Sequence, residues 1–66
     1  MNEFCFVTKQ EKIDRNIAEF AKRAAKYGVE YSITPLAFDE ARVTISGSCN
    51  SKLALLTGIL NRNEDE

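Results

Sequence analysis

The chain has 66 residues, of which nine are basic and ten are acidic, so its formal net charge is −1. This length predicts a single domain over residues 1–66, because a smaller unit could not bury enough apolar surface to offset the entropy of ordering it. The balanced charge argues against broad electrostatic capture of nucleic acid. A core of this size also needs reinforcement by disulfides, a metal or self-association.

Cysteine and histidine usage narrows these three options. Cys5 and Cys49 are the two cysteines, and histidine is absent, so a zinc site would need two thiolates and carboxylates. We predict neither metal nor cofactor. Two cysteines without a secretory signal favour reduced, buried thiols in a cytoplasmic protein. No segment approaches membrane-spanning length, so a membrane is not an expected partner, and self-association as a homodimer is the remaining reinforcement.

Residues 3–7 have the alternation of a strand. Phe4 and Phe6 fall on one side of that strand, and Cys5 and Val7 fall on the other. Both sides are apolar, so alternation alone does not decide which side faces the core.

An amphipathic helix is predicted after this strand. Thr8-Lys9-Gln10-Glu11 fits a capping box, which predicts a helix from near Lys9 with Thr8 as its N-cap. Gly28 predicts the end of the helix, since it readily adopts the positive φ of a C-terminal cap. The apolar stripe between these signals consists of Ile13, Ile17, Phe20, Ala21, Ala24 and Tyr27.

Residues 29–46 return to strand alternation in two segments. Pro35 predicts a bulge or break, and because proline donates no backbone hydrogen bond, it favours an edge position for the first segment. Asp39-Glu40 is the predicted turn. Residues 41–46 then read as a half-buried strand with a polar outer face.

A second helix is predicted near the end of the sequence. Residues 47–51 form a turn-rich junction in which Ser48 or Asn50 is the expected N-cap. The polar, acidic residues 61–66 are expected to fray. The apolar residues of this helix are Leu53, Leu55, Leu56, Ile59 and Leu60.

Together these elements predict an α+β domain with the order β-α-β-β-α. We expect a three-stranded mixed sheet of order 1-3-2 with both helices on one face. The other face would be open and would present one side of the first strand, so Phe4 and Phe6 lie either in the core or on this open face. The remaining predicted residues of the open face are Ser32, Thr34, Arg42, Thr44 and Ser46.

No catalytic constellation or phosphate loop is recognisable, so we expect a protein that is not an enzyme. The leading hypothesis is a small interaction protein that binds and inhibits or regulates a macromolecular partner, as compact phage and mobile-element proteins do. An exposed apolar patch on an open sheet face is typical of an interface. The expected partner-binding residues are Phe4, Phe6, Ser32, Arg42, Thr44 and Ser46.

Two alternatives rest on charge. In a nucleic-acid-binding module, Phe4 and Phe6 would stack on bases while a basic helix face contacts phosphates, although a solvated face explains that charge more simply. In a binder of small anions, the Gly47–Lys52 junction would hold the ligand at a helix start, although the full phosphate-loop pattern is missing. In the nucleic-acid-binding alternative, the basic residues of the helix face are Arg15, Lys22, Arg23 and Lys26.

Overall fold

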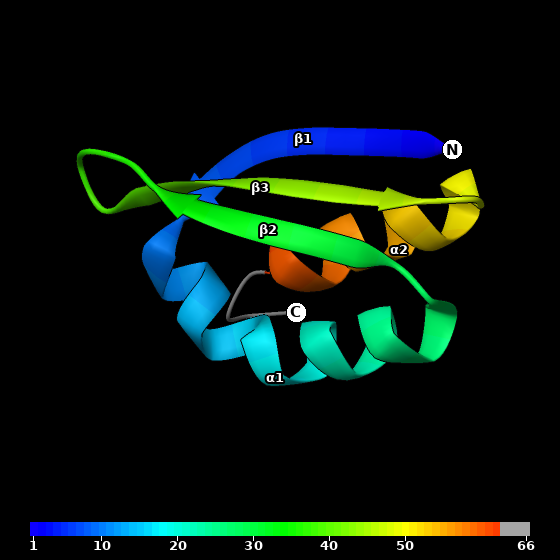
Figure 1. Cartoon of the computed structure of the whole chain (residues 1–66). Coiled ribbons are helices and arrows are strands. Elements are labelled where there is room, and N and C mark those ends of the chain that lie inside the picture. The colour runs from blue at the N-terminus through cyan, green and yellow to red at the C-terminus, as the bar shows by residue number, and fades with distance from the viewer. Residues whose placement is uncertain (63–66) are drawn as a thin grey trace.

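The computed structural model describes residues 1–62 and has the predicted element order (Figure 1). The strands and helices are β1 (Asn2–Lys9), α1 (Gln10–Tyr27), β2 (Glu30–Pro35), β3 (Glu40–Gly47) and α2 (Asn50–Leu60). The sheet has the order β1-β3-β2, and both helices lie on the same side of it. The predicted α+β class, strand order and helix placement are therefore confirmed.

The register of the sheet decides which side chains share a face. β1 and β2 each pair with the central β3 in antiparallel fashion. Neighbouring strands therefore run in opposite directions, and the two outer strands run in the same direction. Phe4 lies opposite Ile45 and Phe6 lies opposite Val43, two fully buried residues. Because residues directly opposite one another point to the same side, Phe4 and Phe6 face the helices.

The start of α1 differs from the prediction. Thr8 is a buried residue of β1 opposite Ala41, so its hydroxyl does not cap the helix. Lys9 is the N-cap residue and makes no side-chain capping bond. Instead, the first helical amide, that of Gln10, donates to the carbonyl of Asp39 at 2.7 Å. The capping-box prediction is therefore wrong, because strand pairing extends through Thr8 and a distant loop supplies the acceptor.

The end of α1 is as predicted. Gly28 has a φ of 68°, and its amide donates to the carbonyl of Ala25. The amide of Val29 donates to the carbonyl of Ala24 at 2.9 Å. This pair of bonds is the Schellman arrangement, which needs a residue that tolerates positive φ.

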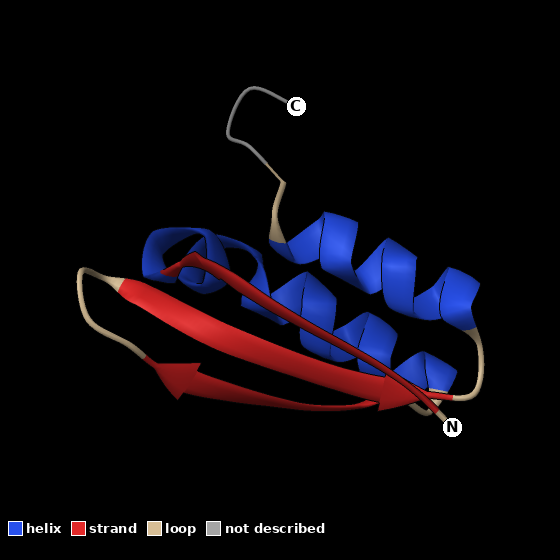
Figure 2. Ribbon diagram, turned by 90° about the horizontal axis from the view of Figure 1, so that it is seen from above, coloured by secondary structure: helices blue, strands red, loops and turns tan. Residues whose placement is uncertain are grey.

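The core lies between the sheet and the two helices, which pack side by side (Figure 2). The predicted stripe of α1 and four of the five predicted apolar residues of α2 are buried or half-buried, whereas Leu55 is exposed. Asn16 is a buried polar residue on α1. Its amide donates to the carbonyls of Lys12 and Leu60 and so joins the helices.

The N-cap of α2 is Cys49, and neither Ser48 nor Asn50 has this role. Asn50 is already the first helical residue, since the extended backbone ends at Cys49, whose carbonyl accepts the amides of Lys52 and Leu53. Both Cys5 and Cys49 are free and exposed. The prediction of buried thiols is wrong, because the register turns Cys5 to the open face and Cys49 occupies a surface junction.

The predicted frayed segment begins with two anchored residues. Asn61 donates to the carbonyl of Thr57, and the guanidinium of Arg62 lies 3.3 Å from a carboxylate oxygen of Glu19. The rest of that segment, residues 63–66, lies outside the described residues. Neither of the helices within residues 1–62 combines the length and apolarity needed to cross a bilayer.

Candidate protein-binding surface

The loop between β2 and β3 carries the most unusual backbone in the described structure. Phe38 and Asp39 have φ values of 62° and 60°, and apart from Gly28 they are the described residues with positive φ. The amide of Glu40 donates to the carbonyl of Ala37 at 3.3 Å. This geometry is that of a type I′ hairpin turn, whose two central positions normally hold asparagine, aspartate or glycine.

The turn is one residue earlier than the predicted Asp39-Glu40, because Glu40 already belongs to β3. The amide of Leu36 donates to the carbonyl of Glu40 at 2.8 Å, so Leu36 and Ala37 together lie opposite a single residue. This is the two-against-one arrangement of a bulge, and it follows directly on Pro35. The break predicted at Pro35 lies just after it, because Pro35 still pairs with Ala41 as the last residue of β2.

Phe38 stands at the tip of this loop with 88% of its surface exposed. The loop projects past the end of the helices in two views of the molecule (Figures 1 and 2). No described core residue shelters the phenyl ring, which is absent from the core cluster and from the side chains packed against it. The chain therefore holds a large aromatic side chain in solvent on a backbone conformation that a bulky residue rarely adopts.

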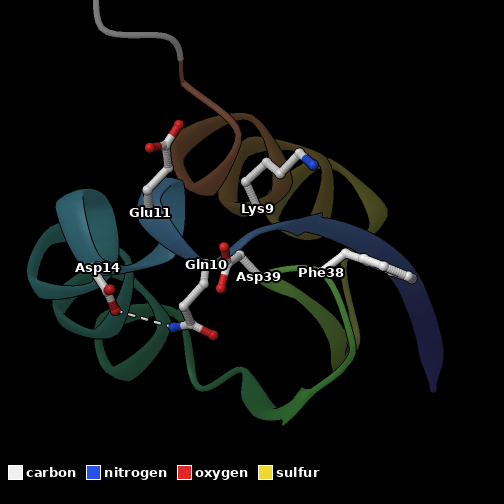
Figure 3. Close-up of a pocket in the computed structure, with 6 residues that line it drawn as sticks. All are labelled: Lys9, Gln10, Glu11, Asp14, Phe38 and Asp39. Atoms are coloured by element: carbon white, nitrogen blue, oxygen red, sulfur yellow. Dashed lines mark hydrogen bonds between the residues drawn. The ribbon is translucent and has the colours of Figure 1, made fainter.

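A shallow hollow of about 390 Å³ adjoins the loop, where the tip meets the first turn of α1. In Figure 3 the phenyl ring of Phe38 points away from the carboxylates of Glu11 and Asp14. The Gln10 side chain donates to a carboxylate oxygen of Asp14 at 3.0 Å. The residues lining the hollow are Lys9, Gln10, Glu11, Asp14, Phe38 and Asp39.

The hollow is negatively charged. Three carboxylates, those of Glu11, Asp14 and Asp39, line it together with one ammonium group, that of Lys9. The Lys9 ammonium lies 3.9 Å from a carboxylate oxygen of Glu40, which neutralises part of its charge. We call Phe38 and this acidic hollow the tip site.

The open sheet face contains four of the residues predicted to bind a partner. Ser32, Thr44, Arg42 and Ser46 are on the side of the sheet away from the helices, as their pairing partners require. A shallow hollow of about 190 Å³ lies over three of them, Ser32, Thr44 and Ser46. The first strand adds Glu3, Cys5, Val7 and Lys9 to this face.

Phe4 and Phe6 are not part of that open face. Both are half-buried and pack against the core, on the side of the sheet opposite to the predicted apolar patch. Val7, which is 50% exposed, is the large apolar side chain that β1 presents on the open face. Of the two placements that the sequence leaves open, the structure has the one that removes both phenylalanines from the expected partner-binding set.

The basic residues predicted on α1 do not form one free patch. The Arg15 guanidinium donates to the carbonyl of Arg62 at 3.0 Å. Arg23 donates to the hydroxyl of Tyr27 at 3.3 Å, which raises the pKa of the guanidinium and lowers the pKa of the Tyr27 hydroxyl. Lys22 and Lys26 are exposed on the same helix.

The start of α2 lies beside the end of α1. The Lys52 ammonium sits 4.0 Å from the centre of the Tyr27 ring, in a cation–π contact. The pKa of the Cys49 thiol is lowered, chiefly because the backbone N–H groups of Lys52 and Ser51 stabilise its thiolate. The Tyr27 ring therefore already engages the Lys52 charge that the anion-binding hypothesis for Gly47–Lys52 assigns to a ligand. Within residues 1–62 no cluster of three histidine, cysteine, aspartate or glutamate residues could hold a metal ion.

Phe38 was missed in the sequence because its hydrophobicity suggested a strand. Pro35 shifts the apolar alternation onto Leu36 and Phe38, so both match a continued strand pattern. The available signal was the five residues 36–40 between Pro35 and the next alternating segment, which suffice for a turn but not for a longer strand.

No protein family matches this chain, and comparison with curated proteins and with solved structures gives no match. The function is therefore inferred from the geometry and charge of the described residues.

Proposed function

We propose that this chain is a small, non-enzymatic interaction protein that binds a protein partner and inhibits or regulates it. In this proposal it acts in the cytoplasm as a homodimer, in the manner of compact inhibitors that phages and mobile elements encode. The tip site is the contact that anchors the partner. The observation that carries the proposal is Phe38, which is 88% exposed at a φ of 62°.

The energetics of Phe38 favour a role outside its own fold. A non-glycine residue at positive φ costs about 1–3 kcal/mol, and such strain clusters at functional sites. A phenyl ring that is 88% exposed gains little packing energy within its own chain to offset this cost. Buried in a partner, however, an aromatic ring removes about 150–250 Å² from water, and aromatic residues dominate the binding energy of many interfaces.

The charge around Phe38 specifies the chemistry of the partner. The carboxylates of Glu11, Asp14 and Asp39 exceed the single ammonium of Lys9, so the complementary surface is an apolar pocket with a basic rim. Complementary charges accelerate association and suppress wrong partners. The open sheet face, with Ser32, Arg42, Thr44 and Ser46, would provide a second, polar area of the same interface.

The nucleic-acid alternative has less support. Its stacking residues Phe4 and Phe6 face the helices, and carboxylates next to the exposed Phe38 would repel phosphates. Arg15 and Arg23 are engaged by groups of their own chain. Titration of labelled single and double strands at low salt tests this alternative directly, and tight, salt-sensitive binding would favour it.

The proposal is tested by affinity capture with three immobilised proteins: wild type, Phe38→Ala and Leu55→Ala. Leu55 is the matched control, because it is a large apolar residue on α2, 46% exposed, and is not among the residues that line the acidic hollow. A partner retained by wild type and Leu55→Ala but lost by Phe38→Ala would support the proposal. Equal capture by all three proteins would show that Phe38 is not the anchor.

A further inference from the structure

The outer edge of β1 is open to pairing. In the order β1-β3-β2, both β1 and β2 are edge strands with backbone groups that have no sheet neighbour on one side. β2 is short and ends in Pro35, two features that discourage pairing at an edge. β1 spans Asn2–Lys9 without proline, and no hydrogen bond from the other described segments occupies its outer side. It is therefore the edge available to another strand.

The side chains of β1 are complementary to a second copy of β1. Two identical antiparallel strands are related by a two-fold axis that lies midway between the two copies of one residue. If that residue is Phe6, Glu3 lies directly opposite Lys9 of the second copy, and this pair of opposite charges occurs twice. Cys5 then lies opposite Val7 of the second copy on the open face. Moving the axis to Cys5 would instead place Glu3 opposite Val7, so charge favours the axis at Phe6.

The same register covers apolar surface. Phe4 and Phe6 are half-buried on the side of the sheet that faces the helices. With the axis at Phe6, the two Phe6 rings meet, and the sheets of both copies join with the helices on one face. A domain of this size gains from such reinforcement, because its own core is small.

We infer that two copies of the chain pair through β1, antiparallel, with Phe6 on the two-fold axis and Glu3 opposite Lys9. This inference rests on the homodimer in the proposed function and adds its surface and register. Phe38 stays accessible, because it belongs to the loop that joins the other two strands, whereas Lys9 is shared between the acidic hollow and this interface.

Charge reversal tests the register. Glu3→Lys and Lys9→Glu each create two like-charged pairs in a homodimer, so each should weaken dimerisation about tenfold or more in sedimentation velocity. A mixture of the two variants restores both opposite-charge pairs and should yield a one-to-one heterodimer. The double variant should again form a homodimer. Circular dichroism verifies that each variant is folded.

Cysteine cross-linking gives an independent readout if either charge variant fails to fold. Cys49→Ser leaves Cys5 as the single thiol, and adding Val7→Cys places the new thiol opposite Cys5 of the second copy. Mild oxidation should link the Val7→Cys chain covalently much faster than the Cys5-only chain. Equally fast linking of the Cys5-only chain would place the axis at Cys5 and overturn the register. A dimer unaffected by either charge reversal would overturn the register with Phe6 on the axis, whereas a wild-type monomer at all concentrations would overturn the homodimer as well.

Discussion

The amide of Gln10 donates to the carbonyl of Asp39 at 2.7 Å and so ties the tip of the β2–β3 loop to the first turn of α1. The bond satisfies a helix N-terminal amide that has no partner within the helix. It also fixes the backbone next to Phe38. A single contact between residues 29 positions apart in sequence therefore starts the helix and orients the candidate binding residue.

Gln10→Pro tests this contact. Gln10 is the first residue of α1, where proline is tolerated, so the substitution removes the amide donor without interrupting the helix. We expect a loss of about 1–3 kcal/mol in the free energy of unfolding, measured with urea. Gln10→Ala is the matched control, because it keeps the amide and removes only the exposed bond to Asp14. A loss of equal size in both variants would show that the amide bond has no special role.

The fold could be predicted from the sequence because its main signals are local and agree with one another. The stripe of α1, the stop at Gly28 and the alternation of the strands lead to the strand order that the structure has. The errors arise where a distant segment competes with a local signal. Thr8 fits a capping box, but pairing with Ala41 holds it in β1. Cysteine is usually buried, but the pairing of Cys5 with Thr44 places its side chain on the open face of the sheet.

The candidate site was less accessible to sequence reasoning. Ser32, Arg42, Thr44 and Ser46 were placed correctly on the open face, since alternation decides this. Phe38 was not identified, because hydrophobicity does not distinguish a strand residue from one displayed at a turn. Its exposure depends on the backbone angles of the turn and on the amide of Gln10, and neither is encoded in a local pattern.

The two glycines at Gly28 and Gly58 should respond oppositely to alanine. Neither position has an atom within 4 Å of an added Cβ, so backbone conformation alone decides the effect. Gly28→Ala forces a Cβ onto a φ of 68° and should cost about 1 kcal/mol. Gly58→Ala lies within α2 and should stabilise the fold by about 0.5–1 kcal/mol. Urea unfolding of both variants checks this, and effects of the same sign would contradict it.

Asn16 should be important for joining the helices. Its amide donates to the carbonyl of Leu60 at 3.3 Å, in the last turn of α2, as well as to Lys12 on its own helix. Asn16→Ala leaves the Leu60 carbonyl without this donor and should destabilise the protein by about 1–3 kcal/mol. Asn61→Ala removes a bond within one chain segment and serves as the control. Thermal unfolding that is equally shifted in both would argue against the inter-helix bond.

Cys49 should ionise at a lower pH in the folded protein than in the unfolded chain. The backbone N–H groups of Lys52 and Ser51 lower the pKa of its thiol, so the folded state releases the proton first. The associated stability is fully present above the unfolded pKa and is lost as the pH falls through the folded pKa. In a Cys5→Ser background, the pH profile of iodoacetamide labelling should have a lower midpoint in buffer than in concentrated urea. Coinciding midpoints would refute the shift.

The role of Phe38 is tested by the free energy of unfolding of Phe38→Gly, measured with urea beside wild type. Glycine adopts positive φ without steric cost, and the 88% exposed ring of Phe38 has little packing to lose. If Phe38 is displayed for a partner at the expense of its own fold, relief of about 1–3 kcal/mol of backbone strain should outweigh the roughly 0.5–1 kcal/mol that glycine costs through the unfolded chain, so Phe38→Gly should be more stable than wild type. A less stable variant would mean that Phe38 supports its own fold, and it would contradict the proposed role as an anchor.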